Sequence, residues 1–313
     1  MTLPIQVAAI VGPTASGKSS LAERLAARLG TSIVSVDAMQ VYRGMDIGTA
    51  KSLPATPGVE LLMVDVADVS DDYSVSLFQH DARACVDGLL ARGVPAVLCG
   101  GTGLYLDAVI DEMDFPTGET RGATRARYEA LAEECGAEAL HALLAERDAK
   151  SAELIHPRNV RRVVRALEML DEGVSYATQN ANLRVRAPHY RTAIWGITMD
   201  RACLYRRIDR RVDVMFEAGL VDEVRRLANQ GLRESVTARQ AIGYKEVLDA
   251  LDGLISMDEA RDVIKARTRR YAKRQLSWLR RDGRTRWIDY DVVSEDEAVA
   301  MILDVLEKGA LDG

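Results

Sequence analysis

Short apolar runs alternate with longer amphipathic stretches over most of the chain. The apolar runs are rich in Val, Ile and Leu and predict buried strands, at residues 5–11, 31–36, 60–65, 94–99 and 190–198. A shorter sixth strand is predicted at 285–289. The stretches between them carry apolar residues three or four positions apart and predict helices, including 20–29, 74–92, 201–218, 221–229 and 257–281. This alternation predicts an α/β fold with a central, mostly parallel sheet.

The strand signals stop between residues 115 and 188. This part is rich in Ala, Leu, Glu and Arg, and its periodicity predicts helices at 124–135, 137–146 and 158–172. Pro157 fits the start of the last of these helices, where its missing N–H costs nothing. We therefore predict a core domain made of residues 1–114 and 189–313, interrupted by an all-helical insertion domain at 115–188.

A phosphate-binding loop follows the first predicted strand. Residues 12–19 read GPTASGKS and match the pattern G-x-x-x-x-G-K-[ST] at each fixed position. Such a loop holds a di- or triphosphate through backbone N–H groups and the helix N-terminus, and the motif does not say whether that ligand is ATP. The residues expected to bind the phosphates are Gly12, Thr14, Ala15, Ser16, Gly17, Lys18 and Ser19, with Ser19 also placed to ligate Mg²⁺. The core is therefore expected to be P-loop NTPase-like.

Further polar residues follow other predicted strands, where open α/β sheets carry their chemistry. Asp37 comes directly after the second strand, and Asp65 ends the third in a weak likeness to a Walker B strand. A second glycine-rich turn at 100–105 places Thr102 after the fourth strand. The stretch 38–51 lacks a clean period and is predicted to form a short helix and a loop.

Composition narrows the class of protein. The 313 residues are 48% hydrophobic and 28% charged, which is ordinary for a globular protein, and no apolar run reaches the length of a membrane span. Met1–Pro4 leads directly into the first strand, so we expect no signal peptide and a cytoplasmic location. The four cysteines have neither metal-site nor disulfide spacing, and they lie at Cys85, Cys99, Cys135 and Cys203.

Arginine is concentrated in blocks although the net charge is −6. The blocks cover residues 158–165, 201–211 and 261–286, and together they indicate a surface for a polyanion. Three functions are compatible with this surface and the phosphate loop. The protein is a small-molecule or nucleotide kinase with the insertion as a lid, an enzyme that modifies a polynucleotide, or a nucleotide-dependent RNA-binding switch.

Several stretches together resemble the bacterial tRNA dimethylallyltransferase family. They appear in the family's order and span nearly the whole chain, at residues 12–19, 35–51, 100–105, 156–168, 240–246 and 271–280. The stretches 37–51 and 273–280 are much more specific than the phosphate loop. Ala38 departs from the serine expected there, a small-for-small change that should not remove activity.

The resemblance implies a reaction and its partners. Family members transfer a dimethylallyl group from dimethylallyl diphosphate to N6 of adenosine 37, beside the anticodon of tRNAs that read codons beginning with U. The phosphate loop would then hold the leaving diphosphate with Mg²⁺ as the cofactor, and the arginines would hold tRNA backbone. We expect no membrane partner and a monomer.

The resemblance also implies roles for individual residues. Asp37 would act as the general base, and Thr102 and Arg211 would assist departure of the diphosphate. Gln40 would hold the flipped base or its neighbour. The positions matching stretches that touch tRNA are Asp37, Ala38, Met39, Gln40, Gly103, Arg161, Arg162, Val163, Val164, Arg165, Gln240, Gly243, Tyr244 and Lys245.

Some choices stay open at this point. Arg207 and Arg210 compete with Arg211 for the diphosphate, and Tyr105 and Tyr244 are candidates either for stacking on bases or for the core. A related family prenylates free adenine nucleotides, and only resemblance separates it from this chain.

Overall fold

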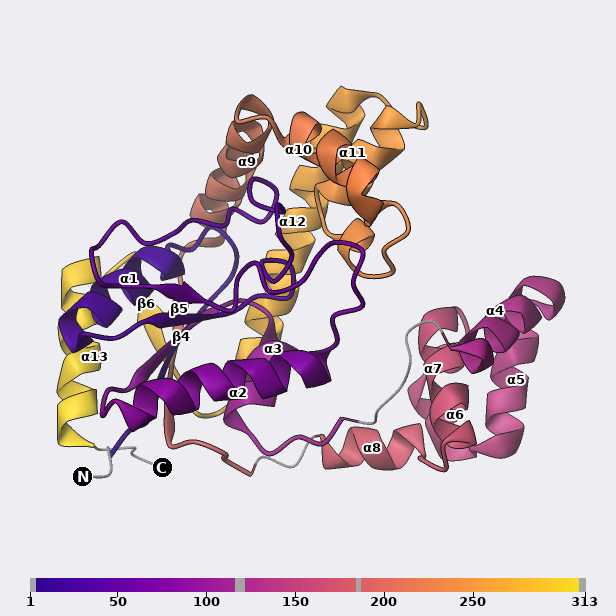
Figure 1. Cartoon of the computed structure of the whole chain (residues 1–313), viewed down its shortest axis with the longest axis horizontal. Coiled ribbons are helices and arrows are strands. Elements are labelled where there is room, and N and C mark those ends of the chain that lie inside the picture. The colour runs from indigo at the N-terminus through magenta and orange to yellow at the C-terminus, as the bar shows by residue number, and fades with distance from the viewer. Residues whose placement is uncertain (1–3, 116–121, 184–186, 310–313) are drawn as a thin grey trace. The chain divides into compact units, whose positions relative to one another are not determined.

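The computed structural model describes residues 4–115, 122–183 and 187–309. Compact packing divides the chain into a core unit made of residues 1–110 and 188–313 and a helical unit made of residues 111–187. Figure 1 shows the two units and their elements. Each unit is described by itself below.

A six-stranded parallel sheet forms the centre of the core unit. Its strands lie in the order β3-β2-β4-β1-β5-β6. Their bounds are β1 Val7–Val11, β2 Ile33–Val36, β3 Leu61–Leu62, β4 Ala96–Gly100, β5 Thr192–Thr198 and β6 Thr285–Asp289. The predicted α/β class and parallel sheet are therefore confirmed.

Alternating side chains divide the core into two layers, one on each face of the sheet. Val7, Ala9 and Val11 of β1 pack on one face, which is covered by helices that include α2 (Val75–Ala91), α3 (Gly103–Ile110) and α10 (Leu220–Leu227). Ala8 and Ile10 pack on the other, against α1 (Lys18–Leu29) and α13 (Glu295–Lys308). Figure 1 shows α1 and α13 apart from α2 and α3.

The remaining helices of the core unit follow β5. They are α9 Arg201–Glu217, α11 Tyr244–Leu251 and α12 Met257–Leu279, with a π-helical turn at Ala228–Leu232 and a 3-10 turn at Ala238–Gln240. A capping box of Ser256 and Glu259 starts α12, which confirms the helix start predicted at residue 257, and Ser294 and Glu297 form the same motif at α13.

The helical unit contains five helices among its described residues. They are α4 Ala123–Cys135, α5 Ala137–Arg147, α6 Ala149–Leu154, α7 Val160–Asp171 and α8 Tyr176–Asn182. Their apolar faces bury a separate cluster that includes Leu140, Leu144 and Leu167. Sequence periodicity missed α6 and α8 because each is too short to show a repeating apolar face. The predicted start of α7 at residue 158 is also too early, because residues 157 and 158 form a turn before the N-cap Asn159.

Two predictions for the segment after β2 are wrong. β3 ends at Leu62 instead of Asp65, because Met63 and Asp65 adopt left-handed backbone conformations with φ of 62° and 56°. The residues 38–51 form turns and no helix. The Glu223 side chain of α10 accepts three backbone N–H groups of this segment, which a helix would have paired with its own carbonyls.

A close approach of β2 and β4 gives a test of this sheet. A Cβ atom at Gly100 would lie 2.3 Å from the Val36 carbonyl oxygen, whereas one at the exposed Gly88 of α2 would meet nothing within 4 Å. We expect Gly100→Ala to lower the free energy of unfolding by about 1–3 kcal/mol or more. Gly88→Ala should raise it by about 0.5–1 kcal/mol, because alanine favours the helix.

Urea unfolding of both variants measures these changes. Equal stability of Gly100→Ala and the unaltered protein would contradict the close strand approach.

Candidate active site

The phosphate loop has the geometry of an anion-binding site. Gly17 and Ala15 adopt left-handed conformations with φ of 97° and 63°, which turn the backbone sharply between β1 and α1. No side chain caps the first turn of α1 among the described residues, which leaves its N–H groups for a ligand. Ser16 is fully buried, and its hydroxyl has no hydrogen-bond partner in the described part of the chain. The loop therefore presents polar groups that the protein itself does not satisfy.

Pairing of β2 with β4 brings Asp37 and Thr102 together. Val36 pairs with Gly100, so the residues that follow each strand leave the same edge of the sheet. The Thr102 hydroxyl accepts the Ala38 N–H at 3.2 Å, and the Thr102 N–H donates to the Val36 carbonyl at 3.3 Å. Asp37 Oδ1 accepts the Met39 N–H at 2.9 Å, which fixes the carboxylate at the end of β2.

Three charged side chains share this site. Burial lowers the pKa of Lys18, and Arg211 lowers it further, while Cys99 and Asp37 raise it. Burial also lowers the pKa of Arg211, and Asp37 opposes that effect. Asp37 thus interacts electrostatically with both cations. Two cations and one carboxylate give the site a net positive charge, which favours binding of an anion.

The structure distinguishes among the candidate arginines of α9. Arg211 is half-buried, interacts with Lys18 and Asp37, and donates from Nη2 to the Thr49 carbonyl at 3.2 Å. Arg207 is more exposed, and its Nη2 lies 3.5 Å from where a Cβ of Gly17 would be. Arg210 is exposed. Arg211 is therefore the arginine that interacts with Asp37. Arg207 lies one helical turn away, beside the phosphate loop.

Gln40 joins β2 to the loop that follows it. Its Oε1 accepts the Ser35 hydroxyl at 2.9 Å, and its Nε2 donates to the Thr49 carbonyl at 3.4 Å. Ala38 and Met39 are half-buried next to it. The segment from Asp37 to Gln40 therefore lies beside Thr102.

A face of α12 that sequence reasoning did not assign completes the site. Gln275 Oε1 accepts the Thr14 N–H at 2.9 Å, and its Nε2 donates to the Gly101 carbonyl at 3.0 Å, so this side chain joins both glycine-rich turns. Tyr271 lies beside Thr102 and Gln275, and burial raises the pKa of its phenol to about 12 while both neighbours oppose that rise. The signal available in the sequence was the helical spacing of Tyr271, Gln275 and Trp278.

Trp278 occupies the third position of this face. Its Nε1 donates to Asp107 Oδ2 at 3.0 Å, and a Cβ at Gly103 would lie 2.2 Å from the indole. Gly103 is therefore required so that α3 can start against α12.

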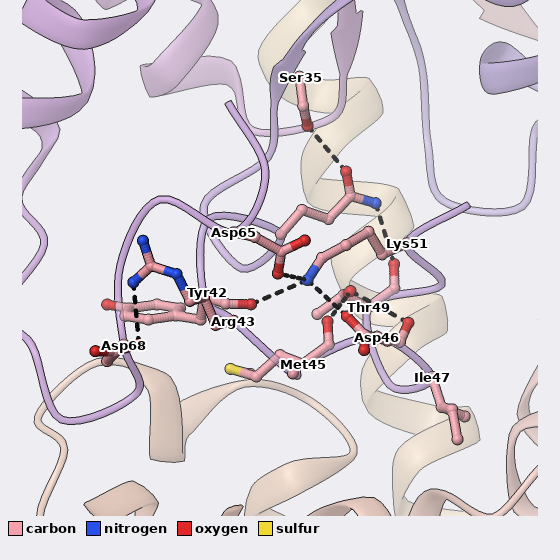
Figure 2. A network of polar contacts seen from close by, with 12 residues as sticks. Ser35, Tyr42, Arg43, Met45, Asp46, Ile47, Thr49, Lys51, Asp65 and Asp68 are labelled. Atoms are coloured by element: carbon pink, nitrogen blue, oxygen red, sulfur yellow. Dashed lines mark hydrogen bonds and ion pairs between the residues drawn. The ribbon is translucent and has the colours of Figure 1, made fainter. Parts of the chain in front are cut away.

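Asp65 does not end a strand, as a Walker B carboxylate would. Figure 2 shows that Lys51 points to Asp65, to Asp46 and to the backbone of Tyr42. The ammonium donates to Asp65 at 2.6 Å and to Asp46 at 2.7 Å, and the lysine side chain is only 4% exposed. These ion pairs hold the loop. Asp65 lies beyond the observed end of β3 at Leu62, so the predicted likeness to a Walker B strand is wrong.

The other residues assigned to tRNA lie in two places. Arg161 and Arg162 are exposed on α7 of the helical unit, and Arg165 is half-buried there. Val163 and Val164 of the same helix are buried in the helical core, so the expectation that their side chains reach tRNA is revised. They hold the helix that presents the arginines.

Gln240, Gly243, Tyr244 and Lys245 lie together at the start of α11. Gln240 is exposed and Lys245 pairs with Asp249. Tyr244 is buried, and its hydroxyl donates to Glu223 at 2.7 Å. Tyr105 is also buried and packs on Phe78 with ring centroids 4.2 Å apart. Both tyrosines are core residues here, and stacking on a base would require them to leave this packing.

Few protein groups are available to a metal ion. The described residues contain no cluster of three or more His, Cys, Asp or Glu side chains suited to one. Ser19 is exposed on the first turn of α1, and Asp37 directly follows β2 in the same site. Mg²⁺ commonly takes one or two protein oxygens and completes its shell with phosphate oxygens and water, so this sparse oxygen set fits Mg²⁺ bound together with a diphosphate.

Comparisons with known proteins identify a family for the chain. A family model described as IPP transferase matches residues 40–282, and one described as isopentenyl transferase matches residues 5–58. The tRNA dimethylallyltransferase of Carboxydothermus hydrogenoformans is 45% identical over 284 residues, which cover 90% of each chain. That of Streptomyces coelicolor is 46% identical and covers 97% of this chain and 96% of its own.

Solved structures give the same result. The tRNA isopentenylpyrophosphate transferase of Bacillus halodurans aligns with a TM-score of 0.70 and 41% identity over 97% of both chains. A eukaryotic dimethylallyltransferase acting on tRNA aligns with a TM-score of 0.81 over 98% of this chain and 81% of its own. Its 24% identity shows the shared fold alone.

The fold and the site define a phosphate-loop α/β protein with a helical insertion. Within that class, the chain belongs to the IPP transferase family, and the resemblance drawn from the sequence is confirmed. No helix in the described ranges is long and apolar enough to cross a membrane.

The lowered pKa of Lys18 gives a test by pH. Lysine is charged below its pKa, so a lowered pKa means that the phosphate loop loses this charge at a lower pH than an ordinary lysine would. We expect affinity for inorganic pyrophosphate to fall faster between about pH 7 and about pH 10 for the unaltered protein than for Lys18→Arg, which stays charged.

Titration calorimetry measures both profiles. Ionisation of the ligand is the same in the two experiments, so it cancels in the comparison. Parallel profiles would show that Lys18 keeps its charge over this range.

Proposed function

We propose that this protein transfers a dimethylallyl group from dimethylallyl diphosphate to N6 of adenosine 37 in tRNAs that read codons beginning with U. The products are N6-isopentenyladenosine in tRNA and diphosphate. The observation that carries this proposal is the position of Asp37, which interacts with Lys18 of the phosphate loop and Arg211 of α9 and lies beside Thr102. A general base therefore adjoins a site for a leaving diphosphate.

The loop side of the site suits a diphosphate that leaves. Breaking the bond between the allylic carbon and oxygen puts negative charge on the diphosphate. Loop N–H groups, Lys18 and Arg211 are already in place to stabilise that charge as it develops. Mg²⁺ bound to the diphosphate and to Ser19 would neutralise part of the same charge.

The Asp37 side of the site suits an exocyclic amine. N6 of adenine is a weak nucleophile because its lone pair is delocalised into the ring. As N6 bonds to the allylic carbon, it must lose a proton, and the Asp37 carboxylate can accept it. Gln40 is fixed at both ends of its amide and is placed to orient the base or its neighbour.

A polynucleotide acceptor is supported by the exposed arginines and by the relatives. The side chains of Arg161 and Arg162 extend from α7 into solvent. There they can contact phosphates of the RNA backbone, which bind without regard to base sequence. Three relatives named tRNA dimethylallyltransferase are 45–47% identical to this chain, and each matches at least 90% of its length. An adenine inside an anticodon loop would have to leave its stack to reach Asp37.

A two-donor assay tests this function. The protein is incubated with Mg²⁺ and unmodified tRNA bearing A at position 37, with either dimethylallyl diphosphate or ATP, and the digested nucleosides are weighed by mass spectrometry. We expect a dimethylallyl adduct on adenosine only with the prenyl donor. An adduct on AMP alone would assign the protein to free-nucleotide prenylation, and consumption of ATP without any adduct would indicate a kinase.

Asp37→Asn tests the general base. Asparagine keeps the volume and can still accept the Met39 N–H, but it cannot take a proton from N6. We expect kcat to fall by about 10²–10⁴-fold, with tRNA affinity and melting temperature little changed.

Asp68→Asn is the matched control. Asp68 is an exposed aspartate paired with Arg43 away from the phosphate loop, so kcat should stay unchanged. Loss of tRNA binding or of folding in Asp37→Asn would instead assign Asp37 a structural role.

A further inference from the structure

One carbonyl oxygen serves two residues of the site. The Thr49 carbonyl accepts from Arg211 Nη2 at 3.2 Å and from Gln40 Nε2 at 3.4 Å. Arg211 belongs to the diphosphate side, and Gln40 belongs to the side of the base. A small displacement of Thr49 would therefore turn both side chains at once.

The loop that carries Thr49 is held from within by Lys51 (Figure 2). The Thr49 hydroxyl also donates to the Met45 carbonyl at 2.6 Å. These contacts fix the shape of the loop but do not attach it to α10, the helix that follows the one carrying Arg211. That attachment needs a group from outside the loop.

Glu223 of α10 supplies most of this attachment, and Arg226 of the same helix adds a bond to the Gly44 carbonyl at 3.0 Å. The Glu223 carboxylate, 6% exposed, accepts the N–H groups of Asp46 at 3.0 Å, Ile47 at 2.8 Å and Gly48 at 3.1 Å. A carboxylate that gathers several backbone N–H groups makes strong, directional bonds. The three residues directly before Thr49 are thereby fixed to α10.

Tyr244 holds the carboxylate in turn. Its hydroxyl donates to Glu223 Oε1 at 2.7 Å, and burial, followed by the charge of Glu223, raises its pKa well above the ordinary value, so the donor proton is kept. The ring also lies under Gly48, where a Cβ would be 2.4 Å from the nearest ring carbon. The turn, the carboxylate and the phenol thus form one packed unit.

We propose that Glu223, held by Tyr244, is a positioning residue that sets the Thr49 carbonyl and through it orients Arg211 toward the diphosphate and Gln40 toward the adenine. This inference rests on the proposed function and adds residues that do not touch either substrate. If Glu223 served stability alone, the effect of its loss on ligand binding would not depend on Arg211.

A double-mutant cycle on pyrophosphate binding separates these two roles. Glu223→Gln keeps the volume but replaces one acceptor with a donor that faces a backbone N–H or the Tyr244 hydroxyl. We expect affinity for inorganic pyrophosphate with Mg²⁺ to fall about tenfold, as for a misplaced charged partner. In an Arg211→Gln background, Glu223→Gln should cause no further loss, because its effect passes through Arg211.

Two further variants protect the test against unfolding and nonspecific effects. Tyr244→Phe keeps the ring under Gly48 and removes one hydrogen bond to Glu223, so we expect a smaller loss of affinity in the same direction. Glu23→Gln is the matched control, because Glu23 also holds a loop, through the N–H and hydroxyl of Thr56 at 2.8 Å, with no contact to Thr49. Its pyrophosphate affinity should not change.

The outcomes are distinct. Equal pyrophosphate affinity in Glu223→Gln and the unaltered protein, or additive losses with Arg211→Gln, would overturn the positioning role and leave Glu223 a structural residue. If the unaltered protein binds pyrophosphate but prenylates no tRNA, the proposed function fails while the cycle still decides the positioning role. Absence of pyrophosphate binding in the unaltered protein would overturn both.

Discussion

Parallel pairing of β1, β4 and β2 is the constraint on which the site depends. Because all three strands run the same way, their carboxyl ends meet at one edge of the sheet. β1 leads into the phosphate loop, β2 into Asp37, and β4 into Thr102. The approach of β2 to β4 at Gly100 is so close that no side chain fits there. Movement of any one strand would separate the phosphate loop, Asp37 and Thr102 from one another.

The charges at the carboxyl edge of the sheet suit a bound ligand better than they suit the stability of the protein alone. Lys18 and Arg211 lose hydration on burial, and Asp37 offsets only part of the loss. The buried Ser16 hydroxyl is unsatisfied within the described residues. Such groups cost folding free energy, and an anion that pairs with them recovers it. The site is therefore polarised before any substrate arrives.

Support for the site comes from helices far away in the sequence. Gln275 is 261 residues from Thr14, and Glu223 is 175 residues from Gly48, yet both hold loops that carry reacting groups. Their partners in these loops are backbone N–H and C=O groups, so the contacts do not depend on a particular loop side chain. Loss of Gln275 or Glu223 removes them.

Much of the fold and part of the site could be predicted from the sequence. The phosphate loop, the order of strands and helices, both capping boxes and the place of Asp37 after β2 follow from local patterns. Short-range physics controls these features: apolar periodicity, glycine conformation and helix capping act within a few residues. The family stretches added Thr102, Gln40 and Arg211, which the structure brings near Asp37 or to the Thr49 carbonyl.

Tertiary structure alone decided the rest. The left-handed turns at Met63 and Asp65, the ion pairs of Lys51 and the buried places of Tyr244, Val163 and Val164 depend on what packs around them. So do the choice of Arg211 over its neighbours and the bridges made by Gln275 and Glu223, because a side chain's partner across the fold leaves no period in the local sequence. Local chemistry therefore determined which groups the protein has, and packing determined which of them meet.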